Sequence, residues 1–214
     1  MTQQPDHESA SNPRWQRRKE ARPTEIVEAA LKLFVERGFA ATKLDEVARA
    51  AGVTKGTLYL YFDSKEALFK AVVQETLLPN ITSAEHVVAD YQGDAASLLL
   101  HLLTIWAERL ATTPTGGISK LMVAEAANFP ELARFYYDEV VVRSTRLFTA
   151  VIERGIAEGT FRPVDAYLAA REISAPIVMA STWAHAFGPL GCEGVEIRSF
   201  ARFHFDVLMN GIRQ

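Results

Sequence analysis

Apolar residues recur every three or four positions along most of the chain, which is the period of an amphipathic helix. In the first such segment, Ile26, Ala30 and Phe34 share one face while Glu28 and Lys32 lie off it. No segment shows the long alternation of apolar and polar residues that is typical of strands. The pattern predicts helices at about 24–37, 45–51, 54–61, 65–78, 84–91, 94–112, 116–127, 130–158, 165–187 and 194–211.

Glycine, proline and serine mark several of the predicted helix ends. Pro23 suits the first turn of the helix at 24–37, and Gly38 suits its end. Ser64 suits the N-cap of the helix that follows it, and Pro79 suits the end of that helix. The predicted fold class is therefore all-α.

The composition is that of an ordinary globular protein, with 214 residues, 49% apolar and 23% charged. The first residues are polar, so they do not resemble a secretory signal. The longest apolar stretches, around 97–107 and 172–189, contain polar interruptions, whereas a bilayer span needs about 20 mostly apolar residues. We predict a cytoplasmic protein that does not bind membranes.

The sequence lacks the catalytic and cofactor-binding motifs that are typical of an enzyme. A single cysteine, Cys192, excludes an intrachain disulfide framework and a cysteine-based zinc site. The spacings of His86, His101, His185 and His204 do not indicate a metal site. No nucleotide-binding glycine loop and no catalytic serine motif is present. We predict that the chain is not an enzyme and needs no cofactor or metal.

Charge divides the chain unevenly. The formal net charge is −3, which argues against a basic, chromatin-like coat. Residues 14–65, however, contain 11 basic and 7 acidic side chains, and residues 66–214 contain 12 and 17. A net charge of +4 therefore lies on the smaller N-terminal part. Within it, the basic segment 14–22 is interpreted either as a solubilising helix extension or as an arm that contacts DNA phosphates or the minor groove.

Residues 44–61, LDEVARAAGVTKGTLYLY, have the pattern of a helix-turn-helix. Ala48 supplies the small residue where the two helices cross, and Gly52 supplies a turn residue that tolerates positive φ. Val47, Val53 and Leu58 fill the crossing. Because small and apolar residues are common in any helical hairpin, a purely structural hairpin is the alternative interpretation.

The longer stretch from Glu25 to Val72 resembles the DNA-binding domain of TetR/AcrR-family transcriptional regulators. The resemblance rests on Ala29-Ala30, Leu33-Phe34, Gly38-Phe39, Thr42, Val47-Ala48, Ala51-Gly52-Val53, Gly56, Leu58-Tyr59, Tyr61-Phe62, Lys65 and Leu68-Phe69. It implies an N-terminal three-helix helix-turn-helix DNA-binding domain and a C-terminal helical ligand-binding and dimerisation domain. We therefore divide the chain into a disordered, basic arm at 1–22, a DNA-binding domain at 23–68 and a ligand-binding and dimerisation domain at 69–214.

The predicted recognition helix, 54–61, begins with hydroxyl groups and a cation, which suit phosphates and groove edges. Lys55 is its strongest candidate for a contact to guanine, and its lack of Asn, Gln and Arg leaves the operator sequence open. The alternative role of Tyr61 is internal packing. The alternative for Lys43 and Arg49 is that both are surrounded by solvent and make no contact with DNA. Thr42 and Lys65, each at the start of a predicted helix, are expected to clamp DNA phosphates. The predicted DNA-binding residues are Thr42, Lys43, Thr54, Lys55, Gly56, Thr57, Tyr59, Tyr61 and Lys65.

The C-terminal part carries many large, soft side chains, most of which are expected to form core. Some are expected to line an apolar cavity with a few polar anchors. The predicted wall consists of His101, Trp106, Met122, Tyr137, Arg143, Met179 and Trp183. The segment 128–161 also resembles, more loosely, the C-terminal domain of the AefR-type subgroup.

The last two predicted helices are expected to form a homodimer interface. They carry small alanines that suit close packing, and the last one carries a bulky set that suits a partner surface: Phe200, Phe203, Phe205, Val207 and Leu208. The resemblance implies a ligand-responsive repressor that releases a near-palindromic, double-stranded DNA operator when a small, largely apolar effector binds. The predicted helix at 65–78 joins both domains and is the expected lever. A DNA-binding regulator or architectural protein without an effector is the alternative function.

Overall fold

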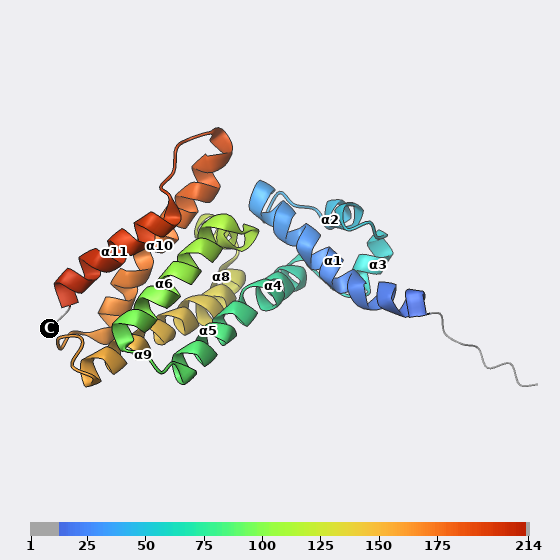
Figure 1. Ribbon diagram of the computed structural model, residues 1–214. Helices are drawn as coiled ribbons and strands as arrows, with labels where there is room; N and C mark the ends of the chain where they lie inside the picture. Colours follow the sequence, from blue (N-terminus) through green and yellow to red (C-terminus); the bar gives the residue numbers. More distant parts are fainter. Residues whose placement is uncertain (1–12, 213–214) are drawn as a thin grey trace, which may run out of the picture.

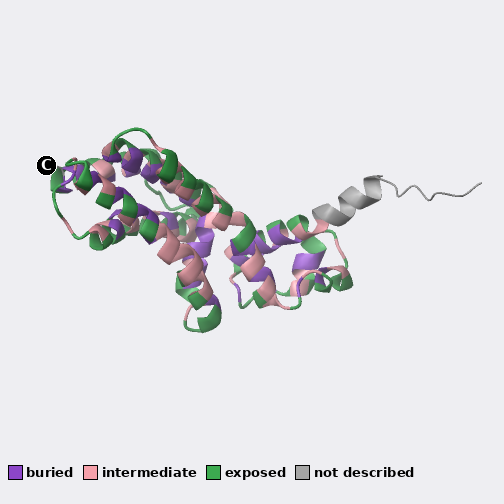
Figure 2. Cartoon of the chain, turned by 90° about the horizontal axis from the view of Figure 1, so that it is seen from below, coloured by how far each residue is buried: buried purple, intermediate pink, exposed green. Residues whose placement is uncertain are grey.

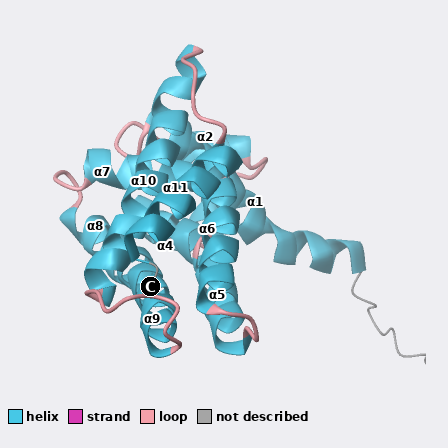
Figure 3. Ribbon diagram, turned by 60° about the vertical axis from the view of Figure 1, so that its left-hand side comes forward, coloured by secondary structure: helices cyan, strands magenta, loops and turns pink. Residues whose placement is uncertain are grey.

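The computed structural model describes residues 13–212, with side chains from residue 22 onward, and the elements of that part of the chain are helices without strands (Figure 3). The predicted disordered tail at 1–12 lies outside the described residues. Along the chain the elements are α1 (Pro13–Arg37), α2 (Leu44–Ala50), α3 (Lys55–Tyr59), α4 (Lys65–Thr76), α5 (Leu78–Asp90), α6 (Ala95–Thr112), η1 (Pro114–Gly116), α7 (Gly117–Glu125), α8 (Pro130–Tyr136), η2 (Tyr137–Val142), α9 (Arg143–Ala157), α10 (Ala166–Phe187), η3 (Gly188–Leu190) and α11 (Ile197–Ile212). The all-α prediction is confirmed.

The first helix begins earlier than the sequence predicted. Pro23 lies inside α1 rather than in its first turn, and α1 runs back to Pro13. The arginine, lysine, glutamate and alanine residues before Pro23 are good helix formers, and they favour a helix that continues through Pro23 although this proline removes one backbone hydrogen bond and crowds the carbonyl group one turn earlier. The backbone of residues 13–22 is thus helical, which corrects the predicted disorder of this part of the arm at 1–22. Contact of the basic segment 14–22 with DNA stays a prediction.

The turns around α2 and α3 are fixed by local chemistry that the sequence predicted well. Gly52 has φ +67° in the turn between the two helices. The Thr54 side chain accepts a hydrogen bond from the Thr57 backbone N–H at 3.1 Å and caps α3. Ser64 caps α4 by accepting from the Ala67 N–H at 3.0 Å, as predicted. Residues 54–61 therefore contain a shorter helix than predicted, ending at Tyr59.

Two features of the C-terminal part were not predicted. A helix was expected from 84, but α5 begins at Leu78, because Pro79 occupies its first turn, where a missing N–H is tolerated. The predicted helix at 130–158 is continuous, but its middle turn, η2, is a π-helix. The extra residue of a π turn leaves no clear periodic signal in sequence, and such turns concentrate at functional sites.

The helices pack around two apolar cores, visible as purple stretches in Figure 2. The first core joins α1–α4 with α7 and α8, and includes Phe34, Phe39 and Phe69. The second core is built from α6, α9, α10 and α11. In Figure 1, α1–α3 lie at one end of the molecule and α4 connects them with the bundle formed by the later helices. Within residues 13–212, no helix has the length and apolarity needed to cross a membrane.

Candidate functional site: a helix-turn-helix surface and an apolar cavity

The helix-turn-helix is held from within by side chains of α2 and α3. Val47, Ala48 and Leu58 are buried at the crossing of the two helices. The side chains that remain outside are those that the sequence assigned to DNA: Lys43, Thr54, Lys55, Gly56 and Tyr59 are exposed, while Thr57 and Tyr61 are half-buried. The fold therefore presents most of the predicted contact residues on one short helix and the turn before it.

Lys55 is an exposed cation at the start of α3 and has an acidic neighbour. Its Nζ lies 2.8 Å from Asp45 Oδ1 and 6.0 Å from the ring centroid of Tyr59. The hydrogen bond to Asp45, reinforced by the charge of that carboxylate, raises the pKa of Lys55. Both partners are more than half exposed, so the pair is solvated and opens at little cost. The geometry holds the charge of Lys55 at the start of α3.

Thr42 and Lys65 are placed differently from the prediction of two phosphate clamps. The Thr42 hydroxyl is buried and donates within the protein, 2.7 Å from the Gly38 carbonyl oxygen and 3.2 Å from that of Leu33. Lys65 Nζ lies 2.8 Å, 3.1 Å and 3.2 Å from the carbonyl oxygens of Phe39, Ala40 and Thr42.

An ammonium group has three donors, and those of Lys65 have three carbonyl partners. The Lys65 cation also lies over the Phe39 ring, 4.5 Å from its centroid. Both predicted clamps are thus occupied in fixing the turn between α1 and α2, because the carbonyls of that turn have no helical partners. Their hydrogen bonds hold the turn that leads into α2.

Sequence reasoning missed one exposed side chain at this surface. Leu60, directly after α3, is 82% exposed, more than any other large apolar residue of the described chain. The helical period could have predicted this exposure. Leu58 and Phe62 lie on the buried face, and Leu60, two residues from each of them, points away from that face. An apolar side chain in this position suits contact with a thymine methyl group.

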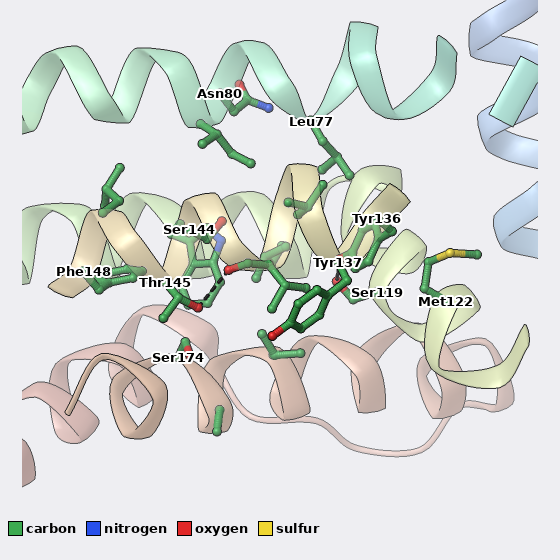
Figure 4. A pocket seen from close by; sticks show the side chains of 18 of the residues that line it. Leu77, Asn80, Ser119, Met122, Tyr136, Tyr137, Ser144, Thr145, Phe148 and Ser174 are labelled. Carbon is green, nitrogen blue, oxygen red and sulfur yellow. Dashed lines mark hydrogen bonds between the residues drawn. The ribbon is translucent and has the colours of Figure 1, made fainter. Parts of the chain in front are cut away.

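A cavity of about 1300 Å³ lies among α5, α6, α7, α8, α9 and α10 (Figure 4). Its lining is mainly apolar, and it includes five of the seven predicted wall residues: His101, Trp106, Met122, Tyr137 and Met179. The volume exceeds the roughly 300–1,000 Å³ of ordinary ligand pockets. The cavity explains why α5 contains no fully buried residue, since part of its inner face borders open space.

The other two predicted wall residues lie elsewhere. The Arg143 guanidinium donates to both carboxylate oxygens of Glu85, at 3.1 and 2.7 Å, and to the Thr82 hydroxyl at 3.1 Å. Hydrogen bonding to Glu85 raises the pKa of Arg143, and the pair ties α9 to α5. Trp183 is 60% exposed on α10. The sequence could not show that Arg143 had a carboxylate partner 58 residues away.

One end of the cavity wall is also part of the first core. Met122, Tyr136 and Leu77 pack in that core and line the cavity. The Tyr136 hydroxyl lies 2.9 Å from the Ser119 hydroxyl, so the polar groups of this end satisfy each other. Burial raises the pKa of Tyr136, and the hydrogen bond with Ser119 lowers it by less. The tyrosine therefore stays neutral and can act as a packing element.

The same helices contact the turn that leads into α2. The Ala40 N–H donates to Glu125 Oε1 at 3.2 Å, and the Phe129 ring packs edge-on against Phe39 with centroids 4.7 Å apart. At Gly117, a Cβ atom would lie 2.3 Å from Val35 Cγ1, so only glycine lets α7 approach α1 this closely. The cavity wall and the helix-turn-helix thus share α7 and α8.

The outer faces of α10 and α11 carry large apolar side chains exposed to solvent. Trp183, Phe187, Phe203 and Val207 are each about half exposed or more. Phe200, Phe205 and Leu208, which the sequence also assigned to a partner surface, are half-buried against the second core. The exposed part of the predicted interface is therefore smaller than the set proposed from sequence.

Two family models match this chain. Residues 26–72 match the model described as bacterial regulatory proteins, tetR family, and residues 89–189 match the tetracyclin repressor-like, C-terminal domain. The HTH-type transcriptional repressor KstR2 of Rhodococcus jostii is 29% identical over 202 residues, which cover 91% of this chain and 92% of that protein.

Solved structures share the fold. The ketosteroid transcriptional regulator KstR2 of Mycobacterium tuberculosis superposes with a TM-score of 0.70 at 23% identity, over 90% of this chain and 95% of that one. FadR from Bacillus subtilis, solved in complex with stearoyl-CoA, also has a TM-score of 0.70, at 20% identity, over 89% of this chain and 99% of that one. At these identities the likeness establishes the architecture.

Proposed function

The chain belongs to the TetR family of bacterial DNA-binding transcriptional regulators, and we propose that it is a repressor released from its operator by an effector in the cavity. Its relatives are regulators rather than enzymes. The single observation that carries the proposal is the shared wall: residues that line the cavity also pack in the core that supports the helix-turn-helix.

We assign DNA contact to the exposed side of α3 and to the turn that precedes α2. Lys43, Thr54, Lys55, Thr57 and Tyr59 have solvent-accessible polar groups on this side. Gly56 adds no side chain and favours close approach of the helix to the groove. Tyr61 remains in the proposed set for its hydroxyl, whereas Thr42 and Lys65 support the surface from behind.

We propose a homodimer through α10 and α11, in which two copies of α3 contact a near-palindromic operator in the cytoplasm. The support is the exposed apolar face of these helices, including Phe203 at 67% exposure. Phe203→Glu is expected to give a monomer by light scattering, because burying a carboxylate at the interface is costly. The unchanged helical signal of the variant serves as the folding control.

The effector is proposed to act by shifting the population of orientations of the two DNA-binding units. Relatives support a lipid-like molecule, since one is described as a ketosteroid regulator and another was solved with stearoyl-CoA. The volume of the cavity supports a larger molecule than the small effector expected from sequence.

The decisive experiment is selection of genomic DNA fragments by the full-length protein, followed by gel shifts on the enriched fragments. We expect a near-palindromic site whose binding weakens steeply with salt, because phosphate contacts release counterions. Reporter transcription from that site should fall when the protein is present. Failure to enrich any sequence would refute the DNA-binding assignment, and a reporter that rises would refute repression.

A further inference from the structure

We infer that the effector is an amphipathic anion, with a long apolar body in the cavity and an acidic group paired with Arg109. This inference rests on the proposed function, because it names the chemical class of the molecule that the cavity binds. It concerns binding alone, and it is testable without DNA.

The shape of the cavity favours an elongated body. In Figure 4 the labelled wall residues follow the axis of α8 and α9, from Met122 and Tyr136 at one end to Phe148 at the other. At the far end, Trp106 and Phe148 pack together with ring centroids 5.4 Å apart. Such a wall binds a long or multi-ring hydrocarbon most tightly, because burial of apolar surface contributes roughly 25 cal/mol per Å² to the binding free energy.

Several hydroxyl groups of the wall already have partners within the protein. Thr145 donates to the Val141 carbonyl oxygen at 2.8 Å, and Thr182 donates to that of Val178 at 2.8 Å. Ser119 and Tyr136 pair with each other. A ligand with many hydroxyl groups would find few free partners along this part of the wall, and each buried hydroxyl group without a partner is costly. The body of the ligand is therefore hydrocarbon.

The charged residues of the wall favour an anion at one end. Three arginines, Arg109, Arg134 and Arg171, line the cavity, against one acidic side chain, Glu172, and all four are exposed at its rim. Arg134 is already neutralised by Asp138, at 2.7 Å. Within the described chain, neither Arg109 nor Arg171 forms an ion pair with a carboxylate. The rim therefore carries an excess of positive charge, and it offers two guanidinium groups without a carboxylate partner to the acidic group of an anion.

Arg109 is the better placed of the two unpaired arginines. It lies on α6 and donates to the side-chain oxygen of Asn80, a neutral acceptor at the start of α5. Asn80 in turn donates to the Thr76 carbonyl oxygen at 2.9 Å, at the end of α4. Figure 4 shows Asn80 and Leu77 above the cavity at this junction. A carboxylate is a stronger acceptor for guanidinium than an amide, so an anion here replaces Asn80 as the partner of Arg109.

The position of this anchor links the ligand class to regulation. The Arg109–Asn80 bond joins α6 to the junction of α4 and α5, and α4 packs against α1 in the first core. Loss of that bond on ligand binding would free the end of α4. An uncharged ligand of the same length fills the cavity but leaves the bond intact.

The test is calorimetric titration of the full-length protein with four probes of one chain length: dodecanoate, dodecanol, dodecylamine and dodecanoyl-CoA. We expect dodecanoate to bind about 10-fold or more tightly than dodecanol, as a charge-assisted pair implies. A preference for the thioester would place the acidic group in a phosphorylated carrier, and a preference for dodecanoate would place it on a free acid. Either preference supports an anionic class.

Variants identify the anchor. Arg109→Gln should lower the affinity for the preferred anion about 10-fold and leave that for dodecanol unchanged, while Arg109→Lys should recover part of it. Arg171→Gln, which removes the same charge from α10, is the matched control and should change affinity less than 3-fold. Equal affinity for dodecanoate and dodecanol, tightest binding of the amine, no binding of either anion, or an unaffected Arg109→Gln would overturn the inference. Binding at Arg109 that leaves an operator complex intact would instead refute the proposed function.

Discussion

The two cores of this protein are built in opposite ways. In the first core, Phe34, Phe39, Phe69 and Phe129 form a chain of rings with adjacent centroids 4.7 to 5.9 Å apart. The second core instead surrounds much of a cavity of about 1300 Å³. Dense packing fixes the geometry of the recognition surface, whereas an open interior can accept ligands of different shape. The difference teaches that holding a recognition surface rigid and leaving room for a ligand place contrary demands on packing.

Removing a ring from the first core is the largest expected perturbation. Phe69→Ala should lower the free energy of unfolding by about 3–5 kcal/mol, because the surrounding rings cannot collapse into the space. Val87→Ala, at the half-buried cavity wall, should lower it by about 1 kcal/mol or less, since open space already adjoins that side chain. Chemical denaturation of both variants measures the contrast, and equal losses would show that the second core is as tightly packed as the first.

Lys65 lies beside the first core, over the Phe39 ring. Its substitution tests whether its charge stabilises the fold or contacts DNA. Lys65→Met keeps the length of the side chain but removes three hydrogen bonds to carbonyl groups, so we expect a loss of about 2 kcal/mol in stability. Lys43→Met, at an exposed position near the same turn, should leave stability unchanged and weaken DNA binding. If Lys65→Met weakens DNA binding with no loss of stability, the phosphate clamp expected from sequence is correct.

Substitution of Lys55 tests the exposed surface of the helix-turn-helix, at the start of α3. Lys55→Gln should weaken operator binding about 10-fold and reduce the slope of the salt dependence by about 1. Thermal stability should stay unchanged, because the pair with Asp45 is exposed to solvent. The comparison is made by gel shifts over a salt series, with Lys32→Gln, on the exposed face of α1, as the control. An unchanged salt slope would remove Lys55 from the phosphate contacts.

The smallest expected effect concerns the contact between the two regions. Glu125→Ala should lower stability by only about 0.5 kcal/mol, because its bond to the Ala40 N–H is exposed. We nevertheless expect the effector to become less able to release DNA, while its affinity for the free protein stays the same. Glu131→Ala, exposed on α8, is the control. If effector response is intact in Glu125→Ala, the two regions communicate through α4 instead.

The fold was predictable where its determinants are local. The turn at Gly52, the cap at Ser64 and the amphipathic helices depend on residues close in sequence, and the structure confirms them. Roles that depend on distant partners were not predictable. Lys65 reaches carbonyls more than 20 residues away, and Arg143 reaches Glu85. Their residue types suggested a phosphate and a ligand, but the partners lie on other helices.

The shared wall has a consequence for protein engineering. The core beneath the DNA-binding helices is completed by Ile118, Leu121 and Leu132, from α7 and α8, far beyond the helix-turn-helix in sequence. A fragment ending after α4 would expose the faces of Phe39 and Phe69 to water. Chimeric regulators that exchange the sensing half should therefore cross over so that α7 and α8 stay matched to α1 and α4. For this chain the transferable module is discontinuous along the sequence.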